Sequence, residues 1–218
     1  MPKRLIAGFL AGTALLAGGP GAALAHADAL AHVDAATTWT VSPGGAATAK
    51  VIAGTLTLTD TSTGTVGTCR SSTATGTVKG GSGLSGQDIG TVTAAHFTTC
   101  AALGSVPLTV RSGGLPWRIS FASYNPKTQV VQGAISGIKV ELTGTACDAV
   151  VNGSSGAAAD GTISAVYNDQ VGELTFLSSG SNLHYWHVKH CGRLINDGDP
   201  VALTASYMVR PVQDVTSP

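Results

Sequence analysis

Charged residues are scarce in this sequence, at 11% of 218 residues, and aromatic residues are scarcer still, at 5%. Soluble domains usually carry roughly a quarter of their residues as charges, so other side chains have to cover this surface. Threonine, serine, alanine and 29 glycines are available for that role. Disorder would require a high net charge and low hydrophobicity, whereas the formal net charge is zero and 43% of the residues are hydrophobic. The composition therefore predicts a folded protein.

Clusters of basic residues are missing as well. Beyond residue 25 the chain has ten lysines and arginines against twelve aspartates and glutamates, and they are scattered singly. Nucleic-acid binding requires a positively charged surface that makes several phosphate contacts. The charge pattern therefore excludes nucleic acid as a partner.

Catalytic and cofactor-binding motifs are also lacking. No serine lies in a GxSxG motif, and Gly80–Gly83 is not followed by the GK[ST] of a phosphate-binding loop. The segment Asn196–Asp199 has too few oxygen ligands for calcium, which takes about six to eight, and is typical of a turn. We assign no catalytic residue and expect no cofactor.

A long apolar run occurs only at the N-terminus. Lys3 and Arg4 precede the apolar stretch Leu5–Ala17, and the small-residue sequence Ala23–Ala25 follows a break that contains glycine and proline. A positive segment, a short apolar segment and a small-residue cleavage site are typical of a secretory signal peptide rather than a membrane span. We expect residues 1–25 to be that signal peptide.

The exported chain is expected to begin shortly after this segment. Cleavage after Ala25 would make His26 the first residue, and Ala27 and Ala31 provide alternative sites. Residues 26–36 are then a flexible mature N-terminus. No later stretch approaches membrane-spanning length, so the sequence predicts a secreted protein without a transmembrane segment.

Four cysteines follow, at positions 69, 100, 147 and 191. An even number of cysteines in an exported chain indicates disulfides, and four cysteines allow three pairings. Zinc sites use closely spaced ligands such as CxxC, but no two of these cysteines are nearer than 31 positions. We therefore expect Cys69, Cys100, Cys147 and Cys191 to form two disulfides and no metal site.

Alternation of apolar and polar residues runs through the mature chain. Ile138–Leu142 alternates, and Val201, Leu203, Ala205, Tyr207 and Val209 would share one face of a final strand. Such short runs, separated by turn residues, are typical of an antiparallel β-sandwich or β-barrel. The sequence predicts a single all-β domain over residues 37–211 and a C-terminal tail over 212–218.

A weak internal repeat suggests two similar halves, each containing one disulfide. Thr63–Cys69 is similar to Thr143–Cys147, and Gly76–Val78 is similar to Gly161–Ile163. The boundary between halves would lie near residues 112–128. If the duplication holds, the disulfides are Cys69–Cys100 and Cys147–Cys191.

Several further stretches carry a family resemblance, namely Trp39–Gly45, Gly83–Gly86, Gly113–Trp117, Asn182–His184, Cys191–Pro200 and Tyr207–Pro211. They resemble a recurrent group of exported, β-rich actinobacterial proteins with two disulfides. The resemblance covers essentially the whole mature chain. It implies export and a β-rich fold, and since the group has no known activity it supplies no functional residues.

Histidines are concentrated in one segment, at positions 184, 187 and 190. Imidazole binds zinc and copper well, but His184 and His187 would point to opposite faces of a strand. We therefore favour a structural role for His184, His187 and His190. His26 could chelate copper as an N-terminal residue, but cleavage after Ala27 would remove it.

Three aromatic residues remain as candidate ligand contacts: Trp117, Tyr185 and Trp186. They could form an exposed patch on a secreted, non-catalytic β-domain that binds a partner. Candidate partners are a cell-envelope polymer, a lipid or a small apolar ligand. Two alternatives stay open, a small extracellular enzyme directed at copper chemistry or carbohydrate and a structural component of the cell surface.

Overall fold

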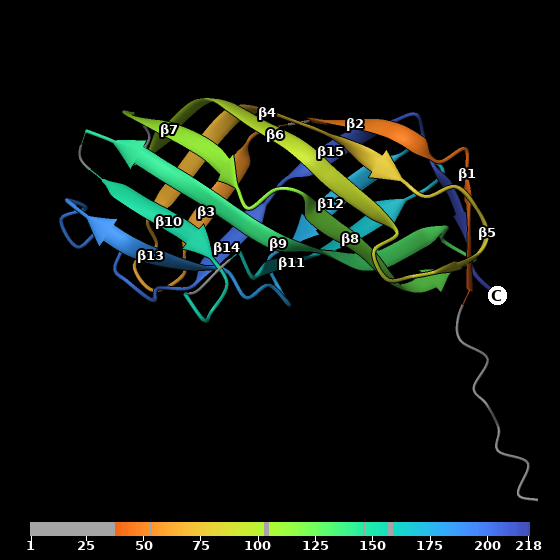
Figure 1. The fold of residues 1–218 in the computed structure, drawn as a ribbon. Coiled ribbons are helices and arrows are strands. Elements are labelled where there is room, and N and C mark those ends of the chain that lie inside the picture. The colour runs from red at the N-terminus through yellow and green to blue at the C-terminus, as the bar shows by residue number, and fades with distance from the viewer. Residues whose placement is uncertain (1–37, 53, 103–104, 146, 157–158) are drawn as a thin grey trace, which may run out of the picture. The chain divides into compact units, whose positions relative to one another are not determined.

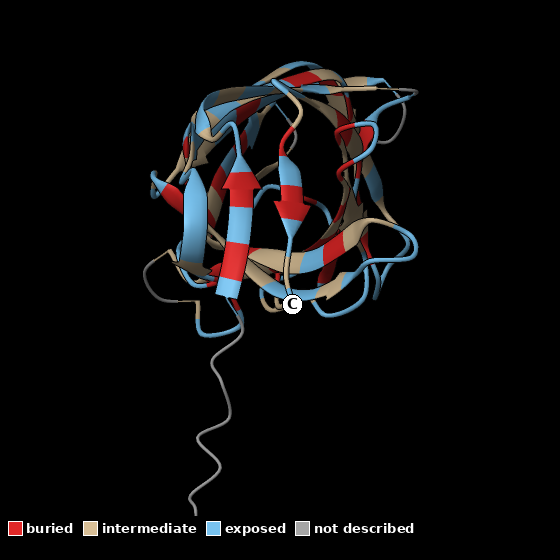
Figure 2. Ribbon diagram, turned by 90° about the vertical axis from the view of Figure 1, so that its right-hand side faces the viewer, coloured by how far each residue is buried: buried red, intermediate tan, exposed pale blue. Residues whose placement is uncertain are grey.

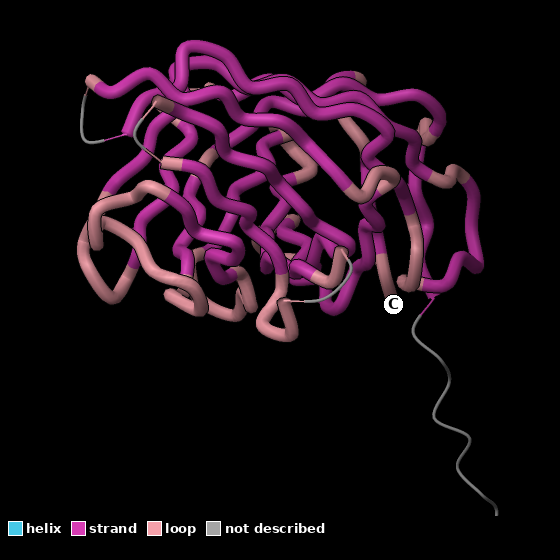
Figure 3. The backbone as a smooth tube through the Cα atoms, turned by 60° about the vertical axis from the view of Figure 1, so that its left-hand side comes forward, coloured by secondary structure: helices cyan, strands magenta, loops and turns pink. Residues whose placement is uncertain are grey.

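The computed structural model describes residues 38–52, 54–102, 105–145, 147–156 and 159–218. These residues form sixteen β-strands and no helix, and Figure 3 shows strand along most of the backbone. The pairings between the strands are antiparallel, and eight strands close into a barrel. The expectation of an all-β antiparallel fold is confirmed, and the form adopted is the barrel.

The strands are, in chain order, β1 (Thr38–Ser42), β2 (Gly45–Val51), β3 (Leu56–Asp60), β4 (Val66–Val78), β5 (Gly81–Ser85), β6 (Gly90–Ala102), β7 (Val106–Gly113), β8 (Trp117–Asn125), β9 (Val130–Gly144), β10 (Asp148–Asn152), β11 (Gly161–Asn168), β12 (Glu173–Leu177), β13 (His184–Lys189), β14 (Val201–Thr204), β15 (Ser206–Arg210) and β16 (Asp214–Thr216).

Eight strands form the closed barrel, which we call the first ring. Around it, β4 pairs with β2, β2 with β15, β15 with β12, β12 with β11, β11 with β9, β9 with β8, β8 with β6, and β6 again with β4. Alternation decides which side chains enter it, because successive residues of a strand face opposite ways. In β11, for example, Ile163, Ala165 and Tyr167 are buried while their neighbours are partly exposed.

The three longest strands, β4, β6 and β9, continue beyond the first ring (Figure 1). Their remaining residues pair with β3, β7 and β10, and these pairings extend to β14 and β13. The Tyr185 amide donates to the Asp199 carbonyl at 2.9 Å, and the Val201 amide donates to the Leu183 carbonyl at 2.8 Å. These bonds join β13 to the chain entering β14 and complete a second ring, so one interior runs through both rings.

β-Bulges let the long strands curve around this interior. The register between β4 and β6 shifts between Thr75 and Gly76. At Gly76 the carbonyl oxygen of Thr91 occupies the position that a Cβ would take. A larger residue would push the two strands apart, which explains the glycine at this point of the barrel wall.

A separate sheet of three strands, in the order β16-β1-β5, lies across one end of the barrel. Figure 2 shows it in front of the barrel opening. Its apolar side chains Trp39, Val41 and Val215 are buried against the barrel residues Val131 and Tyr167. The small sheet therefore closes this end of the interior.

The structure differs from the sequence interpretation at the C-terminus. Residues 212–218, expected to be a tail, contain β16, which pairs with β1, and Val215 is fully buried. The three residues of β16 are too few for an alternating pattern to be recognised in the sequence, and pairing with β1 gives them their strand geometry. The C-terminal residues are thus part of the folded domain.

The disulfides pair as the repeat predicted: Cys69 with Cys100, and Cys147 with Cys191. The strands of the two expected halves are nevertheless interleaved, because β2 pairs with β15 and β3 with β14. Gly76–Val78 ends β4, whereas the similar Gly161–Ile163 begins β11. These similar segments therefore lie at different positions in the fold.

Candidate functional site

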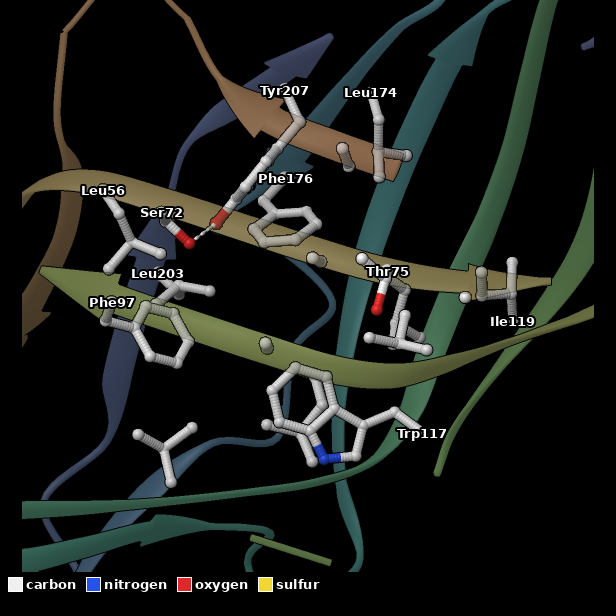
Figure 4. Close-up of a pocket in the computed structure, with 18 of the residues that line it drawn as sticks. Leu56, Ser72, Thr75, Phe97, Trp117, Ile119, Leu174, Phe176, Leu203 and Tyr207 are labelled. Atoms are coloured by element: carbon white, nitrogen blue, oxygen red, sulfur yellow. Dashed lines mark hydrogen bonds between the residues drawn. The ribbon is translucent and has the colours of Figure 1, made fainter. Parts of the chain in front are cut away.

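The barrel interior contains a cavity of about 130 Å³. Its lining comes from both rings and is mostly aliphatic and aromatic, as Figure 4 shows. Among the described residues no charged side chain lines it. An apolar cavity of roughly 150 Å³ in another protein stays dry and binds benzene, so this space has the size and character of a site for a small apolar molecule.

A row of alanines explains why the interior is hollow. Ala49 of β2 lies opposite Ala74 of β4, and Ala74 lies opposite Ala95 of β6. All three line the cavity. Larger residues such as Trp117 complete the lining, and Phe97 and Phe176 remain partly exposed although they line the interior. Because the alanine methyl groups are short, they do not reach the side chains of the opposite wall, and the space between the two walls stays open.

A second chamber of about 80 Å³ adjoins the first. Val78, Ile119 and Leu174 line both chambers. The second chamber extends to Tyr167 and Gln213, beneath the small sheet. Together the chambers form an elongated apolar space along the barrel.

One polar pair lies in the wall of the main cavity. The Tyr207 hydroxyl donates a hydrogen bond to Ser72 Oγ at 2.8 Å, and both side chains are buried. Burial raises the pKa of Tyr207, and the hydrogen bond with Ser72 opposes this only in part. Tyr207 is therefore a neutral phenol at physiological pH.

The aromatic residues expected to form an exposed patch do not form one. Trp117 and Tyr185 are 8% and 4% exposed and belong to the core. The Trp117 indole donates to the Gly113 carbonyl at 2.9 Å, and Trp186 is partly buried with its indole donating to the Gly153 carbonyl at 2.9 Å. An alternating strand of a closed barrel turns its apolar rings inward, and Trp117 thereby lines the cavity instead of the surface.

The histidines are placed separately. His184 Nδ1 lies 2.9 Å from the Asn182 carbonyl, His187 is exposed, and His190 Nδ1 lies 3.7 Å from an Asp148 carboxylate oxygen. No group of three or more metal-ligating side chains is found in the part of the chain that the structure describes. His26 lies outside the described residues.

At the end of the barrel away from the small sheet, Asp60 is fully buried and orders the turn after β3. Its Oδ1 accepts hydrogen bonds from the Ser62 and Thr63 amides at 2.8 and 2.9 Å. Asp199 Oδ2 accepts from the Asn196 amide and side chain, both at 2.8 Å. Desolvation acts to raise the pKa of Asp199, but these bonds, with smaller contributions from Asp60 and Ser62, hold it below its usual value. The segment Asn196–Asp199 is thus a turn, as expected.

Asp169 is a buried acid under the small sheet, 7% exposed. Desolvation raises its pKa, the Val215 amide at 3.4 Å opposes the rise, and the charge of Asp214 adds to it. A carboxyl group whose pKa is higher in the folded than in the unfolded chain adds to the free energy of unfolding at pH values below its unfolded pKa. That contribution is lost as pH rises through the folded pKa.

We therefore expect Asp169→Asn to remove this loss. The difference in unfolding free energy between the variant and the wild type should shift in favour of the variant as pH rises from about 3 to 7. Urea unfolding at both pH values measures it. The matched control is Asp88→Asn, at an exposed acid, and an equal shift in that control would contradict the assignment.

No helix among the described residues is both long and apolar enough to cross a membrane. Comparisons with family models, with curated proteins and with solved structures find no match for this chain. The cavity and its lining are therefore the observations from which a function can be argued. Sequence reasoning placed Tyr207 on one face of the final strand but not in a site, and it did not single out Ala49, Ala74, Ala95 or Ser72. Only small size or polarity at inward positions of alternating strands could have marked these four residues.

Proposed function

We propose that this protein is an exported, non-catalytic binding protein that holds a small apolar ligand inside its β-barrel. The cavity of about 130 Å³ carries the proposal. Ligand sites are concave and mostly apolar, with few polar groups, and a void in a core is destabilising unless something fills it. The row of alanines keeps this void open, and the adjoining chamber lengthens it.

Export is part of the proposal. The two disulfides are consistent with an oxidising compartment, and the first 25 residues have the segments of a signal peptide. Membership in the resembling group of exported actinobacterial proteins is proposed on the same grounds. An extracellular binding protein needs a stable scaffold and no catalytic residues, which suits this chain.

The start of the mature chain tests export. The intact mass of the secreted protein should correspond to a chain beginning at His26 or Asp28. Mass spectrometry of culture supernatant, with whole-cell lysate as the control, measures it. Secreted protein that retains Met1 would contradict the signal-peptide assignment.

Binding is tested by thermal unfolding of the mature protein with small apolar probes such as toluene and octane. A ligand present at about a hundred times its Kd stabilises the folded state by about 2.7 kcal/mol, so the melting temperature should rise and saturate with probe concentration. A folded protein of similar size with a fully packed core is the control. Absence of a saturable rise with every probe, and with xenon, would contradict the proposal.

A further inference from the structure

The two chambers have no positive group with which to pair an acid. The side chains of their described lining are apolar apart from hydroxyls, the Trp117 indole N–H and the Gln213 side-chain amide, and they include no lysine, arginine or histidine. An ionised carboxylate that loses its water shell without a partner is strongly disfavoured. The interior therefore selects against ionised fatty acids and for neutral molecules.

Two polar residues that line the second chamber, Tyr167 and Gln213, are already engaged with each other. The Tyr167 hydroxyl donates to the backbone carbonyl of Gln213 at 3.1 Å and accepts from the backbone amide of Gln213 at 2.8 Å. Gln213 Oε1 accepts from the Gly44 amide at 2.9 Å. This chamber therefore offers a ligand an apolar surface.

The pair of Ser72 and Tyr207 is different. Tyr207 uses its proton in the bond to Ser72 Oγ, and among the described residues the Ser72 hydroxyl donates to no other group. A buried hydroxyl proton without an acceptor is unfavourable, and an oxygen atom of a bound ligand can accept it. Figure 4 shows this pair on one side of the cavity and Ile119, which also lines the second chamber, on the other.

We propose that the ligand is a neutral, elongated apolar molecule with one hydrogen-bond-accepting oxygen, as in a long-chain ketone, ester or alcohol. This inference rests on the proposed function. The oxygen accepts the hydrogen bond from Ser72, and the hydrocarbon chain passes the alanine row toward Ile119 and the second chamber. The hydrogen bond then selects ligands that carry an accepting oxygen, and the uncharged interior selects against ionised ones.

The test compares octan-2-one, octane and octanoate as competitors of a fluorescent apolar probe. The variant Ser72→Ala/Tyr207→Phe removes both partners of the polar pair, which is tolerated better than removing one. The ratio of the octane Kd to the octan-2-one Kd should be about three to ten times larger for the wild type than for the variant. Octanoate should bind at least about a hundredfold more weakly than octan-2-one at pH 7, and should bind once its carboxyl group is protonated.

Equal ratios in wild type and variant, or octanoate binding at pH 7 as tightly as the ketone, would overturn the inference while leaving apolar binding intact. Failure of octan-2-one, octane and octanoate alike to bind would overturn the inference, and the proposed function with it where toluene and xenon also fail to stabilise the protein. If the double variant does not fold, infrared spectroscopy of ¹³C-carbonyl octan-2-one on the wild type decides. The carbonyl stretch should lie below its frequency in hydrocarbon, and an unshifted band refutes the hydrogen bond.

Discussion

Removal of both disulfides should leave the folded domain at most about half as stable as the wild type. The Cys69–Cys100 and Cys147–Cys191 bridges close loops with sequence separations of 31 and 44 residues. By the chain-entropy relation each contributes about 3.5–4 kcal/mol to the free energy of unfolding. A typical domain has about 5–15 kcal/mol in total, so losing both bridges takes away about half of it or more.

The bridges are concentrated in one part of the molecule, which sharpens this expectation. Cys69 and Cys100 join β4 to β6 where these strands belong to the second ring. Cys147 and Cys191 join the start of β10 to the end of β13 in that same ring. The core here is built largely from small aliphatic side chains, which bury less apolar surface than aromatic ones. The second ring therefore depends on covalent closure.

Urea unfolding of Cys69→Ala/Cys100→Ala and of Cys147→Ala/Cys191→Ala measures each contribution. Each pair should lower the unfolding free energy by about 3.5–4 kcal/mol, and the four-residue variant by about 7–8 kcal/mol. The matched control is Ala101→Ser, beside Cys100 on β6 and without a bridge. A loss below about 1 kcal/mol for both pairs would contradict a stabilising role.

Much of the fold could be predicted from alternation. The inward residues Ile163, Ala165 and Tyr167 are where period two places them. The disulfide pairing is the one that the repeat predicted, although the fold interleaves the two expected halves. The final strand shows the limit. Residues expected to form one strand form β14 and β15, divided at Ala205, because β14 pairs with β3 in the second ring and β15 pairs with β2 and β12 in the first. The choice of partners is set by the closed sheet and leaves no local mark on the sequence.

The candidate site could not be predicted for a related reason. Alternation shows which residues face inward, but a cavity depends on which inward residues lie opposite one another. Ala49, Ala74 and Ala95 are far apart in the chain, and only the registers of β2, β4 and β6 bring them into one row. The same limit applies to Trp117, which the sequence interpretation placed in an exposed patch and which the closed barrel buries in its interior.

Ala74→Leu should weaken ligand binding at least about tenfold while preserving the fold. Ala74 is the central member of the alanine row and its methyl group lines the cavity. A leucine there adds three carbons to a space of about 130 Å³ and competes directly with a ligand. Filling an existing void avoids the strain of inserting carbons into a packed core, so the melting temperature should stay the same or rise.

The affinity for toluene or octane should fall at least about tenfold, because each ligand carbon that is displaced forfeits about 0.8 kcal/mol of burial. Titration of the fluorescent apolar probe against Ala74→Leu measures this loss. Thr73→Leu is the matched control, since Thr73 precedes Ala74 on β4, is exposed and pairs with Lys50 and His96. That control should bind as the wild type does, because its side chain points away from the cavity. Undiminished binding by a folded Ala74→Leu would place the ligand outside the barrel, and a loss shared by Thr73→Leu would assign it to the outer face of β4.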